Sequence, residues 1–489
     1  MMPWRWYVAL VIGVAVYYVA AMLLTSDLHE YADLRHHVDY SVGAHLPFRV
    51  AYQPDSGWKL VLLVWAFAAW LGYCGYKLAD ALRASPVSRF APIGVGFAVL
   101  AIMLTFVPFT FSGDPYVYVI FGHVYGLHGI NPYLLLQPLQ IHGDPVLDRS
   151  LAFYGNPPPG DNYGPLWTFI CAALARVEAN ASLGVQLWSY RFLAAASMLI
   201  AAAGLFRLIS KSQVTGAISR VALFAYHPLV LYESAVGAHN DATMMAFAVW
   251  AFALVDDFPL FAGLLIGASI AVKFVSIIAL PFLALRAARK SRISGALVLV
   301  LALVVFGLCF RPFWAGTATL FELVRHGGIF AMSPTWLVNV PFFARGLGNS
   351  PAFGGAVSLP FLGQPSWPRL VQLIAFCAFL IVALFSLFRY ARSFASAEIW
   401  RSVTAFLWAS PIIQPWYLMW LAPAVADQGP WSVFAWWFAG LAFLRYALDG
   451  WSLTPLPALV VLTLVMLLAP IVAARQGAPR SQAAAGAVT

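Results

Sequence analysis

A succession of long apolar runs constrains the fold of this 489-residue chain more than any other feature. Hydrophobic residues make up 62% of the chain and charged residues only 10%, whereas soluble domains average about 45–50% and about 25%. No soluble fold of this length can bury so much apolar surface, which excludes a soluble enzyme, a disordered chain and a nucleic-acid-binding domain. Since a spanning helix needs roughly 20 apolar residues, we predict an all-α polytopic membrane protein with about 10–14 transmembrane helices. The apolar runs lie at residues 4–24, 59–83, 89–110, 183–209, 216–234, 240–256, 259–272, 274–288, 294–313, 368–391, 398–412, 415–427, 430–448 and 453–474.

Basic residues gather in the short connections between these runs. Lys and Arg resist translocation and therefore collect in cytoplasmic loops. With both termini cytoplasmic, more than half of the 28 basic residues fall in inner segments, while the longer outer segments 25–58 and 111–182 are acidic. Membrane orientation therefore explains most of the net charge of +9, and nucleic acid is not expected as a partner. The inner basic residues are Arg5, Lys77, Arg83, Arg89, Arg207, Lys211, Arg220, Arg286, Arg289, Lys290, Arg292, Arg389, Arg392, Arg401, Arg475 and Arg480.

Three outer connections are large, at residues 25–58, 111–182 and 314–367. Elaborated loops on one face favour function on that face. Within the second, residues 163–178 look helical, but a crossing there would invert the downstream charge pattern, so we expect an interfacial or re-entrant helix. Residues 4–24 are too long for a signal-peptide core and lack a cleavage site, which predicts a retained first span. The four cysteines form no CxxC pair, which argues against a disulfide framework or metal cluster.

A carboxylate stands at the end of the third apolar run, in Ser112-Gly113-Asp114-Pro115-Tyr116. Asp followed by Pro is a common helix start, with the Asp side chain capping the first turn. The same carboxylate at the outer membrane face is also placed to take a proton from an acceptor hydroxyl. The sequence leaves both interpretations open for Asp114.

Two further polar clusters interrupt apolar sequence on the outer side. The stretch from Asp161 to Trp167 contains Tyr163 and suits sugar stacking or, equally, a membrane-interface belt. The stretch from Glu233 to Asp241 contains His239 and Asn240 between apolar walls. Polar groups at membrane depth are expensive, so this second cluster predicts either a functional site or a buried capping network.

Lys273 lies inside an apolar run, about 13 residues from the inner basic cluster. It is too far from that cluster to reach the inner face, so we expect it to extend outward and meet an anionic group such as a phosphate. The alternatives are outward snorkelling or pairing with Asp241. Weaker members of the same outer set are Arg311 and the Gln414-Pro415-Trp416-Tyr417 break, whereas His227 is expected to be a satisfied core histidine.

Nucleotide-binding signatures are missing from the chain, which has no GxxxxGK[ST] and no GxGxxG after a strand. Without a soluble domain for a nucleotide sugar, an activated sugar would have to arrive on a membrane lipid. No cofactor is required by the sequence, and a divalent cation (Mg²⁺ or Mn²⁺) is left open.

At these clusters the sequence resembles the GT-C class of integral-membrane glycosyltransferases, and most of all the bacterial polyprenol-phosphate-mannose-dependent mannosyltransferases. The matching stretches occur in the family's order over roughly residues 90–425 and read GDPYVYVIFGHVYGLHGINPY, NYGPLW, HPLVLYESAVGAHNDATMMAF, AVKFVSIIALPFLAL and QPWYLMWLAP. The resemblance implies a GT-C-like bundle with interfacial helices in a large outer loop and a catalytic Asp that maps onto Asp114. Many GT-C enzymes carry paired acidic residues here, whereas Asp114 lies between Gly113 and Pro115, so a second acidic partner and any metal stay unassigned.

By the same pattern the chain divides into four parts. Residues 1–88 are a two-helix addition with outer loop 25–58, and residues 89–427 are the catalytic core with outer loops 111–182 and 314–367. Residues 428–475 hold C-terminal transmembrane helices. Residues 476–489 are a disordered cytoplasmic tail.

The resemblance implies transfer of a hexose, mannose above all, from a polyprenyl-phosphate donor to a glycan or lipid-linked acceptor at the outer face of the bacterial cytoplasmic membrane, where membrane lipids are further partners. We expect an inverting displacement with Asp114 as general base, and Lys273, Arg311 and His239 at the donor phosphate. A transporter or lipid flippase, and a scaffold without chemistry, remain the alternatives. The residues expected to bind sugar or acceptor are Tyr163, Asn240, Asp241, Glu233, Tyr116, Gln414, Trp416 and Tyr417.

Overall fold

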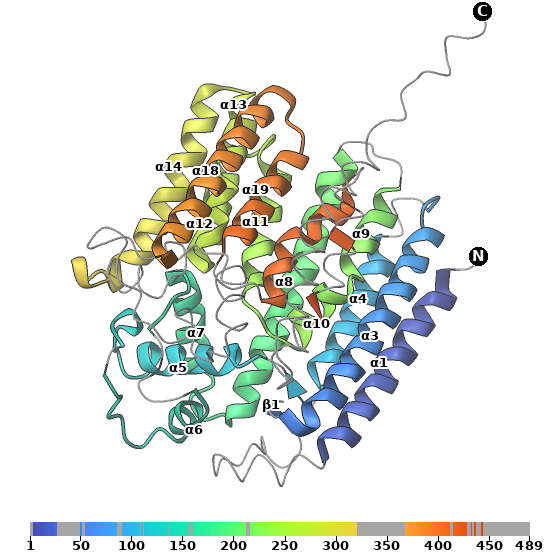
Figure 1. Cartoon of the computed structure of the whole chain (residues 1–489), viewed down its shortest axis with the longest axis vertical. Helices are drawn as coiled ribbons and strands as arrows, with labels where there is room; N and C mark the ends of the chain where they lie inside the picture. The colour runs from blue at the N-terminus through green and yellow to red at the C-terminus, as the bar shows by residue number, and fades with distance from the viewer. Residues whose placement is uncertain are drawn as a thin grey trace, which may run out of the picture.

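The computed structural model describes residues 3–26, 49–50, 54–85, 90–107, 109–110, 112–135, 137–154, 158, 160–211, 216–319, 367–410, 414–427, 432, 435–436 and 442–443. They form an assembly of helices, so the predicted all-α membrane class is confirmed (Figure 1). Within the described residues, five helices are long and apolar enough to cross a membrane, at Pro3–Leu24, Lys59–Ala81, Leu183–Lys211, Arg292–Phe313 and Leu373–Ser393. Shorter apolar helices accompany them, and the count of ten to fourteen crossings stays a prediction.

Several expected segments lie outside the described residues. They are most of the loops 25–58 and 314–367, most of the C-terminal helices at 428–475, and the tail 476–489.

One group of helices comes from the N-terminal part of the chain. It contains α1 (Pro3–Ser26), α3 (Pro54–Ala81), α4 (Phe90–Thr105) and α9 (Ala217–Ala225), which lie side by side on the right in Figure 1. The only strands in the described residues are the two-residue β1 (Arg49–Val50) and β2 (Phe109–Thr110), which pair in parallel. The helix α4 of this group ends at Thr105, and the chain continues from there to Asp114 at the start of the next helix.

Short helices at the lower left of Figure 1 form the segment between α4 and the long α8 (Leu183–Lys211). They are α5 (Asp114–Gly126), the 3-10 turn η2 (Pro132–Leu134), α6 (Pro145–Tyr154) and α7 (Pro165–Val177). Two glycines one turn apart, Gly122 and Gly126, let α5 approach α7 closely, because a Cβ on either would lie under 3.0 Å from the α7 backbone. The expected helix at 163–178 is present as α7.

The second large group forms the upper left of Figure 1, and α8 runs between the two groups. Proline begins several of its helices, as expected at a first helical position that needs no N–H partner. Its elements are α11 (Asp241–Leu254), α12 (Pro259–Val272), η3 (Phe274–Ile278), α13 (Leu280–Ala288), α14 (Arg292–Phe310), η4 (Arg311–Phe313), α18 (Trp367–Ser393) and α19 (Ala397–Ala409). The 3-10 helix η5 (Pro415–Ala426) packs against α9 and α10 (Pro228–Ala235) as well as against α11 and α19, so it joins the two groups.

Three of the predicted apolar runs are broken, and each break lies near polar residues. The run at 216–234 divides into α9 and α10 (Pro228–Ala235), where the His227 Nδ1 accepts the Leu229 N–H and caps the second helix. The imidazole is buried in the core as expected, whereas its Nε2 atom makes no hydrogen bond to the described residues. The run at 274–288 divides into η3 and α13, and it follows Lys273, whose backbone is extended between α12 and η3. The run at 415–427 forms a 3-10 helix rather than an α-helix.

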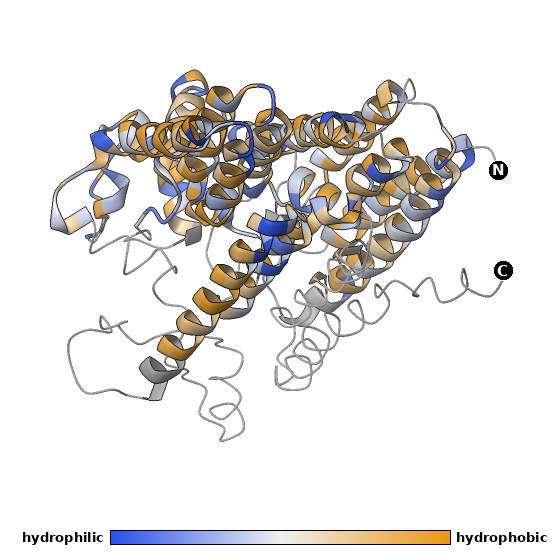
Figure 2. Ribbon diagram, turned by 90° about the horizontal axis from the view of Figure 1, so that it is seen from above, coloured by the Kyte–Doolittle hydropathy of each residue, from blue (hydrophilic) through white to orange (hydrophobic). Residues whose placement is uncertain are grey.

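The outside of the bundle is largely apolar, and polar residues gather at helix ends and loops (Figure 2). Side chains such as Val304, Leu308 and Ile381 are exposed, as expected for helix faces that contact lipid. One end of the bundle carries ion pairs between neighbouring helices, and we call it the basic end. Its pairs are Arg207 and Lys211 with Asp257, Arg286 with Asp256, and Arg389 and Arg401 with Glu398.

Candidate active site

The turn between α10 and α11 brings four polar residues into the centre of the protein. Glu233, His239, Asn240 and Asp241 are each fully buried. Ala238 within the turn has a φ of 58°, a left-handed conformation that costs about 1 kcal/mol or more for a residue with a side chain. Strain of this kind persists only where the surrounding structure enforces it, so the tight turn fixes the direction of the polar side chains.

Asp114 is the first residue of α5, and its carboxylate contacts the α10–α11 turn. Gly113 occupies the N-cap position and no side chain caps the helix, so the capping interpretation of Asp114 is wrong. The Oδ2 atom of Asp114 instead lies 3.2 Å from His239 Nδ1. Burial raises the pKa of Asp114, but a hydrogen bond from His239, the charges of His239 and Lys273, and a hydrogen bond from Tyr163 outweigh it and lower the pKa below its usual value. Asp114 is therefore an ionised carboxylate at neutral pH.

His239 lies between two carboxylates and beneath an indole ring. Its Nε2 atom is 3.4 Å from Glu233 Oε2, on the side opposite Asp114. The imidazole stacks on Trp416 with a centroid distance of 3.9 Å and an angle of 14°. Burial alone would lower the pKa of His239, but hydrogen bonding to Asp114 and Glu233 and their charges raise it to about 9. His239 is thus positively charged at neutral pH, and both ring nitrogens carry protons.

Lys273 forms a second charged pair with Asp241, which confirms the pairing alternative. The Lys273 Nζ donates to both carboxylate oxygens of Asp241, at 2.9 and 2.8 Å, and the Trp420 indole N–H donates to the same carboxylate. The ammonium lies 4.8 Å from the ring centroid of Tyr417 and 5.8 Å from that of Tyr163. Its charge is therefore balanced by a carboxylate and faced by aromatic rings.

Asn240 carries a buried carboxamide that makes no hydrogen bond to the described part of the chain. Its backbone N–H donates to the Tyr118 hydroxyl at 3.3 Å, and its C=O accepts the Met244 N–H within α11. The side-chain Nδ2 and Oδ1 atoms make no hydrogen bond in the described structure. An unsatisfied buried polar group costs about 1–3 kcal/mol, so a polar ligand at this position would remove an existing penalty.

The segment before α7 holds Tyr163 beside the two charged pairs. Asp161 accepts the Tyr163 N–H at 2.8 Å and the Thr168 hydroxyl at 2.6 Å, and the Tyr133 hydroxyl donates to the Tyr163 carbonyl. The Gly164 N–H donates to the carbonyl of Val272, next to Lys273. These bonds connect the segment before α7 to the extended residue between α12 and η3, which explains why Tyr163 and Lys273 lie together.

The other residues predicted for the site lie at varying distances from the two charged pairs. Tyr116 is buried on α5, close enough to Arg191 for their charges to interact, and Tyr417 stacks on Trp420 beside Lys273. Gln414 precedes η5 without capping it. Arg311 is exposed in η4 at the end of α14, and no hydrogen bond or ion pair joins it to the described residues of the site.

Sequence reasoning missed three residues that support the site. Trp420 and Tyr118 contact Asp241 and Asn240 directly. The buried guanidinium of Arg191 donates to the carbonyls of Thr105 and Val107, near the end of α4 and ahead of Asp114. The signal was available for Arg191, since a lone basic residue in the apolar run 183–209 is costly. Trp420 lies one helical turn after Trp416 and could have been grouped with it.

A metal ion is not supported by the described side chains. No group of three or more His, Cys, Asp or Glu residues in that part of the chain is arranged to hold one. The carboxylates of the site are instead matched by His239 and Lys273, so we assign no step to Mg²⁺ or Mn²⁺.

The described residues define an all-helical membrane protein with a buried cluster of a carboxylate, an imidazole and aromatic rings. A comparison with family models gives its kind: residues 7–289 match the family described as alpha-(1->6)-mannopyranosyltransferase, N-terminal domain. The chain belongs to this family and is a hexosyltransferase, which confirms the expected enzyme class over a transporter or scaffold. The match includes α1 and α3 as well as the polar residues from Asp114 to Lys273. No curated protein matches the chain.

Proposed function

We propose that this protein transfers mannose from a polyprenyl-phosphate donor to a glycan or lipid-linked acceptor and forms an α-(1→6) linkage with inversion. The family supplies the sugar and the linkage. The observation that carries the mechanism is the contact between Asp114 and His239, because it places an ionised carboxylate in a polar site next to a fixed positive charge.

Asp114 acts as the general base in this mechanism. The acceptor oxygen attacks the anomeric carbon of mannose, and the bond from that carbon to the phosphate oxygen breaks. The acceptor proton passes to Asp114, and polyprenyl phosphate leaves with the bonding electrons. The lowered pKa keeps Asp114 ready to accept a proton, and a positioned base of this kind contributes about 10²–10⁴-fold to a rate.

The positive groups of the site stabilise the departing phosphate. Lys273 and His239 face the reaction from two sides, although each is also paired with a carboxylate. Binding of a phosphate would shift the Lys273 ammonium away from Asp241 or share it between the two anions. Arg311 is exposed in η4 and makes no described contact with the site, so its proposed role is to attract the anionic donor and not to act during transfer.

Tyr163, Asn240 and the aromatic rings around Lys273 bind the sugar or the acceptor. The carboxamide of Asn240 supplies one donor and one acceptor that no described residue satisfies. Trp416, Tyr417 and Trp420 supply ring faces for stacking. Tyr116, Glu233 and Gln414 complete the set as residues that surround the site.

The site faces the outer side of a bacterial cytoplasmic membrane, and both termini are cytoplasmic. The helix α11 begins at Asp241, and the η3–α13 segment follows Lys273. Both segments end at the basic end. The 14 helical residues of α11 measure about 20 Å. Basic residues mark the cytoplasmic face. The charged pair Asp241–Lys273 therefore lies at the opposite, periplasmic end of these helices.

The test is incubation of the purified protein with radiolabelled polyprenyl-phosphate mannose and a membrane-extract acceptor, followed by linkage analysis of the product. An α-linked product formed with inversion requires a β-linked donor, so the β-anomer should react and the α-anomer should not. Reaction of the α-anomer alone would overturn the inverting mechanism. Counter-flow of intact donor without a covalent product would contradict transfer itself.

A further inference from the structure

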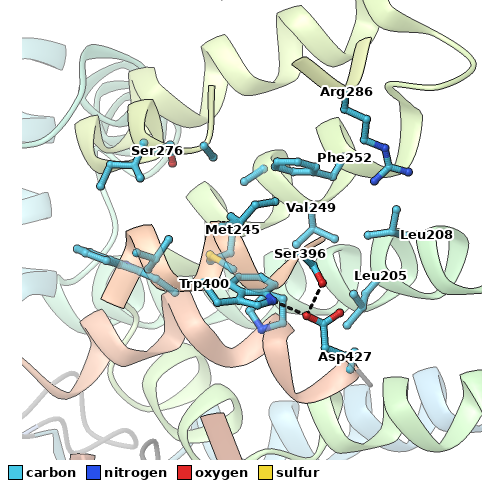
Figure 3. Close-up of a pocket in the computed structure, with 18 of the residues that line it drawn as sticks. Leu205, Leu208, Met245, Val249, Phe252, Ser276, Arg286, Ser396, Trp400 and Asp427 are labelled. Atoms are coloured by element: carbon cyan, nitrogen blue, oxygen red, sulfur yellow. Dashed lines mark hydrogen bonds between the residues drawn. The ribbon is translucent and has the colours of Figure 1, made fainter. Parts of the chain in front are cut away.

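Two adjoining cavities at the basic end differ in chemistry. The first has a volume of about 450 Å³, lies between α8, α11, α13, α19 and η5, and is lined mostly by apolar side chains such as Leu205, Val249 and Phe252 (Figure 3). It extends from Arg286 and Asp427 at the basic end to Ser276 and Trp420 near the candidate active site. Its mostly apolar lining matches a hydrocarbon chain better than a sugar.

The second cavity has a volume of about 560 Å³ and is lined by charged side chains. Arg286, Arg289, Lys290 and Asp256 contribute to it. Arg286 is paired with Asp256, at 3.0 and 2.5 Å. Arg289 lies 4.4 Å from the ring centroid of Phe394, and neither Arg289 nor Lys290 forms an ion pair with a described carboxylate. The cavity therefore carries a net positive charge.

The two cavities share Arg286 and Phe394 in their linings. A ligand that fills both must have an anionic head and an apolar chain. A free phosphate would leave the apolar cavity empty, and a neutral lipid would leave Arg289 and Lys290 without a counter-charge. The apolar lining accepts a hydrocarbon chain without leaving polar groups unpaired, and basic residues near a membrane surface attract anionic lipids.

We propose that these joined cavities bind one anionic phospholipid from the cytoplasmic leaflet. The phosphate lies against Arg289 and Lys290, and one acyl chain occupies the apolar cavity. The end of that chain approaches Trp420, whose indole N–H donates to Asp241. The bound lipid therefore packs against Trp420 and supports that side of the candidate active site. This site adjoins the proposed substrate site through Trp420, and its phosphate-binding residues Arg289 and Lys290 take no part in the proposed reaction.

Native mass spectrometry of the detergent-solubilised full chain tests the proposal with phosphatidylglycerol, phosphatidylcholine and inorganic phosphate as probes. We expect one phosphatidylglycerol to bind more tightly than phosphatidylcholine, and inorganic phosphate not to compete at millimolar concentration. The double variant Arg289→Ala/Lys290→Ala should weaken phosphatidylglycerol roughly 30-fold, at about tenfold per 1.4 kcal/mol. The matched control Lys77→Ala/Arg292→Ala removes the same charge outside the cavity and should retain wild-type binding.

The chain cavity is tested separately. Ala248→Phe places a ring in the apolar cavity and should abolish binding of the lipid, whereas Val304→Phe, on an exposed face of α14, should not. Equal loss in both double variants would show general attraction to a basic surface and overturn the proposal. Full competition by inorganic phosphate, or unchanged binding in Ala248→Phe, would overturn it as well. Thermal unfolding of each variant without lipid verifies that it is folded.

Discussion

The imidazole of His239 lies 3.2 Å from the carboxylate of Asp114, although 125 residues separate them in the chain. Glu233 approaches the same ring from the other side, so one charged imidazole is shared by two carboxylates. Removal of His239 would therefore leave two carboxylates facing each other without the positive charge between them. The two carboxylates differ in exposure, because Asp114 is partly accessible and Glu233 is fully buried. Asp114 can therefore meet a substrate as a base, whereas Glu233 can only orient the imidazole ring.

Substitution Asp114→Asn should lower the rate of mannosyl transfer by about 10²–10⁴-fold, because the amide cannot accept the acceptor proton. The measurement is kcat with saturating donor and acceptor. Asp148→Asn is the matched control, since Asp148 is an exposed carboxylate of the same outer segment and should leave kcat unchanged. A folded Asp114→Asn protein with most of its activity would show that another group is the base.

The rate should fall as pH rises through about 9, where His239 loses its proton. A folded-state pKa above the ordinary value means that the charged ring stabilises the fold below its unfolded pKa of about 6.5 and that this contribution is lost as the pH passes 9. His239→Gln should therefore show a lower rate and no decline near pH 9. Thermal unfolding between pH 6 and 10 provides the independent readout, and an unchanged alkaline decline in the variant would contradict the assignment.

Removal of either partner of the Lys273–Asp241 pair should destabilise the protein by about 3–5 kcal/mol, since it leaves a buried charge alone. The double variant Lys273→Met/Asp241→Asn should recover much of that stability. Activity should not recover with it, because the ammonium also serves the donor phosphate. Recovery of both stability and kcat in the double variant would reduce the pair to a structural role.

The substitution Asn240→Leu should weaken substrate binding without lowering the thermal stability of the protein. The apolar side chain removes two unsatisfied buried atoms, so thermal stability should stay equal or rise slightly. Substrate binding should weaken, visible as a higher KM for donor or acceptor with the fold intact. Loss of stability together with unchanged KM would mean that Asn240 packs the turn and does not meet substrate.

A substitution at Gly237 tests whether the tight α10–α11 turn is needed to position the His239 ring. A Cβ at this position would lie 2.6 Å from the His239 ring and 2.9 Å from the Glu233 carboxylate. Gly237→Ala should therefore displace the ring, cost about 1–3 kcal/mol and lower kcat. Gly307→Ala is the control, because a Cβ there meets open space on α14. Wild-type kcat in Gly237→Ala would show that the position of His239 tolerates change.

Composition and the spacing of apolar runs were sufficient to predict the all-helical membrane class, because lipid requires every backbone polar group to be satisfied within helices. The same reasoning singled out Asp114, the residues from Glu233 to Asp241, and Lys273, since each is a polar exception in apolar sequence. It could not decide whether Asp114 caps its own helix or contacts another one, because both interpretations use the same Asp-Pro pair.

Only the tertiary structure determined which polar residues meet. It paired Lys273 with Asp241, placed His239 between Asp114 and Glu233, and left Arg311 exposed outside the site. The physical reason is that a buried charge needs an oppositely charged partner close in space. The sequence shows which residues are charged but not which of them lie within contact distance. Trp420 and Arg191 stand out in the sequence as an indole close to Trp416 and a basic residue in an apolar run, but only the packing of distant helices shows which groups they contact.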